Sequence, residues 1–169
     1  MLSTLALFIF PVLMAYAASS DLLTMRIANW LVLLVIVAYL ALALFVQLPW
    51  DQVGWAAVAA AVVLVVAFAF FAFGWIGGGD AKLVAASSLW IGLSFMLQYL
   101  VYAALLGGAL TLIILAFRRY PLPGWLSRHK WIDRLHDTKS GVPYGIALAI
   151  AGILVYPETP IFLRLLGGQ

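Results

Sequence analysis

The sequence predicts an all-α membrane protein, a polytopic bundle of about six transmembrane helices with the N-terminus outside. Of its 169 residues, 67% are hydrophobic and only 9% are charged, whereas a soluble domain carries about 25% charged residues. The few charges are also segregated, and the uncharged runs between them are close to the roughly 20 residues that cross a bilayer. We therefore expect one integral-membrane domain, residues 1–169, with a cytoplasmic loop at 118–141.

The uncharged runs give the expected helices in order. The run Leu83–Phe117 is too long for one ordinary span. The glycine and serine of its "IGLS" segment indicate a break at Ile91–Ser94, and the helix before that break is too short to cross fully. The six expected helices are Leu2–Ser20, Ala28–Leu48, Gln52–Ile76, Asp80–Trp90, Phe95–Phe117 and Val142–Tyr156.

The basic residues set the expected orientation. With the N-terminus outside, eight of the nine Lys and Arg residues face the cytoplasm, and only Arg164 lies outside. Most of the eight lie in the loop 118–141, so the net charge of +3 indicates contact with anionic lipid headgroups rather than nucleic acid. Four tryptophans also lie near expected helix ends, where amphipathic rings prefer the interface. They are Trp30, Trp50, Trp75 and Trp90.

No cofactor or metal is expected. The chain has no cysteine, which excludes disulfides, cysteine nucleophiles and cysteine-based zinc sites. His129 and His136 lie seven residues apart in the charged loop and indicate a metal pair only weakly. Two solvated loop histidines are the simpler interpretation.

Two acidic residues are candidates for chemistry. Asp21 and Asp80 lie at the cytoplasmic ends of expected helices, whereas the other four acids lie in turns, in the charged loop or beyond the last helix. An ionisable group at membrane depth costs free energy and is a functional candidate by default. Two carboxyls in contact would share a proton, one acting as a base toward water and the other as an acid toward a carbonyl. That is the chemistry of an aspartic protease.

The glycines before Asp80 fit this use. Gly77, Gly78 and Gly79 allow a bend and the close approach of a substrate strand. The start of the following helix would favour the anionic form of Asp80. Two other interpretations stay open. Either acid could be a helix cap, or the pair could serve an ion- or proton-coupled transporter, although carriers bind near the midplane.

Three segments resemble motifs of the prepilin peptidases, which are type IV leader peptidases and GxGD intramembrane aspartyl proteases. The segments are "SDLLTMRIAN" at Ser20–Asn29, "GGGDAK" at Gly77–Lys82 and "GVPYGIALAIAG" at Gly141–Gly152. They resemble, in order, the first-aspartate motif, the GxGD motif and the Pro-Tyr-Gly segment that opens the last helix. The resemblance implies an aspartic endopeptidase with Asp21 and Asp80 as catalytic residues. Its partner would be a prepilin or pilin-like precursor, cleaved near the cytoplasmic face of the bacterial inner membrane.

The departures from the family pattern narrow this expectation. Ala28 stands where the family has proline, and Ser20 together with the Pro-Tyr-Gly segment favours the prepilin branch over presenilin-like relatives. Larger prepilin peptidases carry a cytoplasmic segment with paired cysteines that is linked to N-methylation. The resemblance therefore implies a short form, as in Flp or tight-adherence pili, that cleaves without methylating. A non-catalytic scaffold for pilus assembly is a further alternative.

Other residues of these segments are expected to bind substrate or support the site. The basic residues could instead contact headgroups, the asparagine could cap a helix, and the tyrosine could belong to the interface belt. The supporting candidates are Gly77, Gly79, Lys82, Arg26, Asn29, Pro143, Tyr144 and Gly145. The amphipathic segment Trp125–Leu135 is expected to lie on the membrane. The oligomeric state is not predicted.

Overall fold

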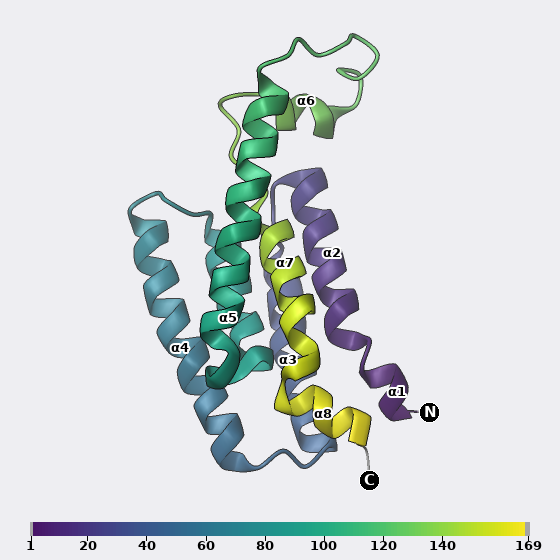
Figure 1. Ribbon diagram of the computed structural model, residues 1–169, viewed down its shortest axis with the longest axis vertical. Helices are drawn as coiled ribbons and strands as arrows, with labels where there is room; N and C mark the ends of the chain where they lie inside the picture. The colour runs from purple at the N-terminus through teal and green to yellow at the C-terminus, as the bar shows by residue number, and fades with distance from the viewer. Residues whose placement is uncertain (1, 168–169) are drawn as a thin grey trace.

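The computed structural model describes residues 2–167, and the regular secondary structure of this part of the chain is helical, without strands. The elements are α1 (Leu2–Ala6), α2 (Ile9–Thr24), α3 (Asn29–Phe45), α4 (Trp50–Ala72), α5 (Gly78–Arg118), α6 (Lys130–His136), α7 (Tyr144–Val155), the 3-10 helix η1 (Tyr156–Glu158) and α8 (Pro160–Gly167). Figure 1 shows the long helices side by side, with α6 at one end and both termini toward the other. The predicted all-α class is confirmed.

Several helices are long and apolar enough to cross a membrane. Within residues 2–167 these are Thr4–Thr24, α4 and α5, and the bent pair of α7–η1 with α8 makes a fourth at most. The two parts of that pair meet at an angle of 53°. α3 is equally apolar but has only 17 residues. The chain is therefore a membrane protein, while the six spans and the external N-terminus stay predictions.

The long helix α5 is interrupted at Gly92. A straight helix of its 41 residues would be about 62 Å long, yet Ser88 Oγ lies 3.5 Å from Met96 Sδ. Asp80 and Gly107 also line one cavity, which a straight helix would not allow. Gly92 has φ 72° and ψ 168°, so the chain turns back there. This confirms the break predicted at 91–94 and makes α5 a pair of helices, its first half (residues 78–91) and its second half (residues 93–118).

Gly92→Ala is expected to lower the free energy of unfolding by about 1–3 kcal/mol, because this backbone conformation is essentially restricted to glycine. An added Cβ would meet nothing within 4 Å, so the loss reflects backbone strain alone. The matched control is Gly54→Ala in α4, which is also open and is expected to gain about 0.5–1 kcal/mol. Unfolding followed by circular dichroism in detergent measures both. Equal shifts for the two variants would contradict the assignment of strain to residue 92.

The first predicted helix is wrong in its boundaries. It was expected as one helix over Leu2–Ser20, but the structure separates α1 from α2 around residues 7–8. Pro11 explains this break, since it has no N–H to donate to the carbonyl of residue 7 and its ring clashes with that carbonyl. α2 then continues to Thr24, which places Asp21 inside the last turn of α2.

The remaining boundaries agree with the prediction within a few residues, with two exceptions. α8 was not expected at all. α6 covers only Lys130–His136, part of the amphipathic segment predicted at Trp125–Leu135. That segment lies beside one end of the bundle, where it follows the second half of α5 (Figure 1).

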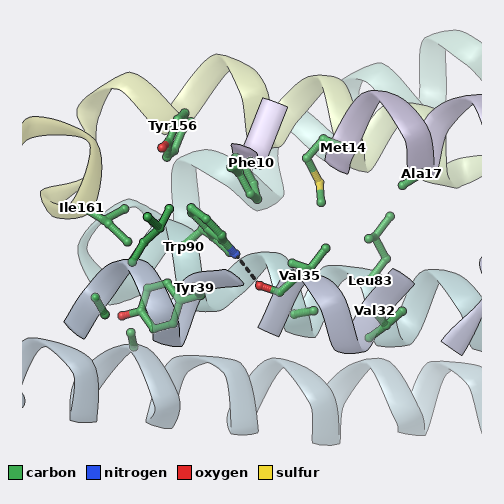
Figure 2. Close-up of a cluster of buried hydrophobic side chains, with 14 of the residues drawn as sticks. Phe10, Met14, Ala17, Val32, Val35, Tyr39, Leu83, Trp90, Tyr156 and Ile161 are labelled. Carbon is green, nitrogen blue, oxygen red and sulfur yellow. Dashed lines mark hydrogen bonds between the residues drawn. The ribbon is translucent and has the colours of Figure 1, made fainter. Parts of the chain in front are cut away.

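The core is organised around Trp90. Its side chain is 1% exposed, and its Nε1 donates a hydrogen bond to the carbonyl of Val35 at 3.0 Å. Its ring stacks on Phe10 at 4.8 Å between centroids, and Tyr39 and Tyr156 lie edge-on to it (Figure 2). The prediction that Trp90 lies at the membrane interface is therefore wrong. Its bond to a helix carbonyl satisfies the indole N–H away from water.

Candidate functional site

Asp21 joins the end of α2 to the start of α7. Its side chain is 5% exposed, and its Oδ2 accepts a hydrogen bond from the Gly145 backbone N–H at 2.8 Å. Gly145 is the second residue of α7, after the N-cap Pro143, so Asp21 satisfies one of the free N–H groups that begin a helix. A negative charge is stabilised in that position. Asp21 lies in the last turn of its own helix and caps the start of α7 instead, so the capping alternative considered for Asp21 applies to a different helix.

Gly145 is required by this close approach. A Cβ at residue 145 would lie 2.8 Å from Asp21 Oδ2 and 3.0 Å from Asp21 Cβ. Such contacts are too short for any side chain, so only glycine lets the α7 backbone meet the carboxylate. Pro143, the buried N-cap of α7, lies two residues before Gly145. The Pro-Tyr-Gly segment therefore shapes the start of α7, as predicted.

Asp80 lies in the first turn of α5. The N-cap of this helix is Gly77, which makes Asp80 the third helical residue rather than the N-cap that was considered from the sequence. A side chain at this position can reach back toward the cap. Consistent with this, a Cβ built on Gly77 would lie 2.9 Å from Asp80 Oδ2. Gly77 thus leaves the space that the Asp80 carboxyl occupies.

Ile27 packs between the start of α5 and the start of α7. A Cβ on Gly79, next to Asp80, would lie 3.2 Å from Ile27 Cβ, and a Cβ on Gly145 would lie 3.0 Å from Ile27 Cδ1. Ile27 is buried, and the two glycines let the starts of α5 and α7 pack against it. Ile27 therefore links the residue before Asp80 to the α7 residue whose N–H binds Asp21. The structure thus brings together two acids that are 59 residues apart in the sequence.

A cavity of about 520 Å³ lies beside Asp80. It is bounded by α4, by both halves of α5 and by α7, and its lining is apolar apart from Asp80 and Tyr144. The Tyr144 hydroxyl lies 3.0 Å from Thr111 Oγ1. The Tyr144 ring packs against Gly107, where an added Cβ would lie 3.1 Å from the ring carbons. Tyr144 is therefore held against the second half of α5, at the edge of the cavity.

Three of the predicted supporting residues lie elsewhere. Lys82 Nζ donates a hydrogen bond to Asn29 Oδ1 at 3.0 Å, at an exposed position. Asn29 does not cap α3, because the N-cap is Ala28 and no side-chain bond is made there. Arg26 is exposed, and its backbone carbonyl accepts a bond from the Ser20 hydroxyl at 3.0 Å. The hydrogen bonds described for these three residues within 2–167 do not include either carboxyl.

Arg118 is a supporting residue that sequence reasoning missed. Its Nε donates to the Leu135 carbonyl at 2.8 Å, and its Nη2 donates to the carbonyls of Ser140 and Gly141 at 3.1 and 2.9 Å. It therefore fixes the segment that leads into α7 and Gly145. In the sequence it was only one basic residue among several in the loop. Carbonyl partners distant along the chain leave no sequence signal.

The loop histidines have separate contacts. His136 Nε2 lies 2.8 Å from the Tyr120 carbonyl, and its ring meets Phe117 edge-on. His129 is the N-cap of α6. Among residues 2–167, no group of three or more His, Asp or Glu side chains is placed to hold a metal ion.

The fold and the site define a membrane protein with two acidic side chains at one end of an apolar helix bundle, beside an apolar cavity. A family model described as the type IV leader peptidase family matches residues 8–112. Because that match covers more than half of the chain, the protein belongs to the type IV leader peptidase family, and its general function is that of a leader peptidase. The matched residues include both Asp21 and Asp80. Searches of curated proteins and of solved structures gave no match.

Proposed function

We propose that the protein is an aspartic endopeptidase that removes the cytoplasmic leader from a prepilin or pilin-like precursor, with Asp21 and Asp80 as its catalytic pair. The observation that carries the proposal is the packing of Ile27 against Gly79, next to Asp80, and against Gly145, whose N–H binds Asp21. Asp21 is fixed by Gly145, and Asp80 faces the cavity. One acid is thus held rigidly while the other is open to a substrate.

The proposed reaction uses the pair as one acid and one base. The ionised carboxyl takes a proton from water, and the water oxygen attacks the scissile carbonyl. The protonated carboxyl donates to the carbonyl oxygen, which gives a tetrahedral diol. The carboxylate left by that donation then takes a proton back from the diol. The carboxyl that took the proton from water gives it to the leaving amine, and the C–N bond breaks. Because the two groups are coupled, the acid and base roles belong to the pair.

The proposed location of the site is the cytoplasmic face of the bacterial inner membrane. Asp21 is near the end of α2, and Asp80 and Gly145 are near the starts of α5 and α7. Figure 1 shows these helix ends on the side of the bundle that carries α6. Basic loops stay on the cytoplasmic side during membrane insertion. A leader that precedes an apolar helix would therefore meet the carboxyls where it leaves the membrane. We further propose that cleavage occurs without N-methylation, as in the short Flp-type enzymes.

The experiment is cleavage of a pilin-like precursor by the purified protein in lipid vesicles, followed by intact mass spectrometry. We expect the leader to be lost at one bond and the new N-terminus to carry no methyl group. Protein-free vesicles with the same precursor are the control. An unchanged precursor, together with ion or proton uptake into the vesicles, would overturn the peptidase proposal in favour of a transporter.

A further inference from the structure

We propose that the apolar helix of the precursor reaches Asp80 sideways from the bilayer, through a groove between α4 and the second half of α5. The inference rests on the proposed function, because it assigns a binding surface to that substrate. The groove is the cavity of about 520 Å³ that Asp80 lines. We call it the lateral groove.

The lateral groove is lined by apolar residues along its length and by Asp80 at one end. Its lining on α4 runs from Val62 to Phe70, which corresponds to about 12 Å along a helix. Asp80 and Tyr144 line the end at which α4 finishes and α5 and α7 begin. An apolar segment in the groove would therefore point one of its ends at the carboxyl.

The groove opens toward lipid. Four of its apolar lining residues, Val62, Val66, Phe70 and Leu100, keep 57%, 48%, 42% and 39% of their surface exposed. They lie within helices apolar enough to cross a membrane, so in a bilayer this exposed surface would face hydrocarbon. A partner that is itself in the bilayer can approach this opening without passing through water.

The size of the groove fits one face of a helix. Two turns of a helix about 10 Å wide fill roughly 850 Å³, which is more than the 520 Å³ of the cavity. The groove therefore admits the side chains of one face, as in other helix-in-groove complexes. Part of its wall is made of small residues, Ala103, Ala104 and Gly107, and such residues let a second helix approach closely.

The occupant we assign is a precursor helix rather than a lipid tail. A lipid tail would fill the apolar part but would bring no peptide bond to Asp80. A leader precursor has its scissile bond directly before an apolar helix. If that helix lies in the apolar part of the groove, its scissile bond lies at the end lined by Asp80. The last turn of that helix must unwind at Asp80, because helical carbonyls are otherwise engaged in backbone hydrogen bonds.

The first test fills the groove. Ala104→Trp is compared with Ala109→Trp, a change in the same half of α5 that does not line the groove. We expect Ala104→Trp to raise KM for the full precursor about tenfold with kcat little changed, since it removes binding shared by ground and transition states. Cleavage of a short peptide that spans the same bond without the apolar helix should be unchanged. Ala104→Trp that cleaves the precursor with wild-type KM would overturn the inference.

The second test measures binding of the precursor rather than its cleavage, and it does not use the tryptophan variant. A photo-crosslinking amino acid, p-benzoylphenylalanine, is placed at Val66 in the groove or at Val65, which is 70% exposed and outside it. We expect a crosslink to the precursor from position 66 and not from position 65. Crosslinks to lipid alone would overturn the inference. A precursor crosslink without any cleavage would support the groove while the proposed reaction fails.

Discussion

Replacing either Asp21 or Asp80 by Asn should abolish leader removal, with a fall in rate of at least about 10³-fold, because general acid and base catalysis by the pair is lost. Asn keeps an oxygen that can accept the Gly145 N–H bond of 2.8 Å, so the Asp21 variant is expected to fold. Leader removal is measured by intact mass spectrometry of the co-expressed precursor. The unfolding temperature of each variant shows whether the bundle is intact.

The controls for this prediction distinguish the loss of a catalytic group from the loss of any one negative charge. Asp51→Asn changes an exposed acid in the first turn of α4, at the opposite end of the bundle, and should leave cleavage unchanged. The double variant should be no slower than either single one, since groups that act as a unit are not additive. If a folded Asp80→Asn protein matures the precursor at a normal rate, Asp80 is a helix-terminus residue and not a catalyst.

Gly145→Ala should have the second largest effect. The added Cβ would lie 2.8 Å from Asp21 Oδ2 and 3.0 Å from Ile27 Cδ1, so α7, Asp21 or Ile27 must move. Displacing a catalytic group by about 1 Å can cost 10²-fold in rate, and overpacking costs about 1–3 kcal/mol of stability. We expect both effects, measured as the cleavage rate of the purified variant and as its unfolding free energy.

Gly108→Ala is the matched control for this change. Residue 108 lies in the second half of α5, and an added Cβ would meet nothing within 4 Å. A helical Gly→Ala change in open space should stabilise by about 0.5–1 kcal/mol and leave the cleavage rate unchanged. Wild-type cleavage by Gly145→Ala would show that the contact between α7 and Asp21 is not needed for the reaction.

Much of the fold could be predicted because a bilayer restricts the possible structures. Uncharged runs mark the helices, and a run too long for one span implies a break. The break at Gly92 was predictable from Gly92 and Ser94 because few residues adopt the backbone angles of a reversal. The missing N–H of Pro11 also indicates the separation of α1 from α2, whereas the unbroken apolar run predicts one helix.

The contacts that build the site could not be predicted in the same way. Asp21, Asp80 and Gly145 are candidates on sequence alone, but nothing local shows that the Gly145 N–H binds Asp21 across 124 residues. The packing of Ile27 against Gly79 and Gly145 is likewise tertiary. Trp90 was misplaced for a related reason. A tryptophan near a helix end looks interfacial unless its partner carbonyl, here that of Val35, is known.

The bond between Asp21 and Gly145 also fixes when the protein becomes active during its synthesis. Asp21 leaves the ribosome well before its donor Gly145, which lies in α7, 124 residues further along the chain. Chains emerge from the N-terminus onward, so every nascent chain carries an incomplete site until α7 has inserted. A chain truncated before residue 144 should therefore reach the membrane as an inactive protein, and proteolytic activity cannot precede the completed bundle.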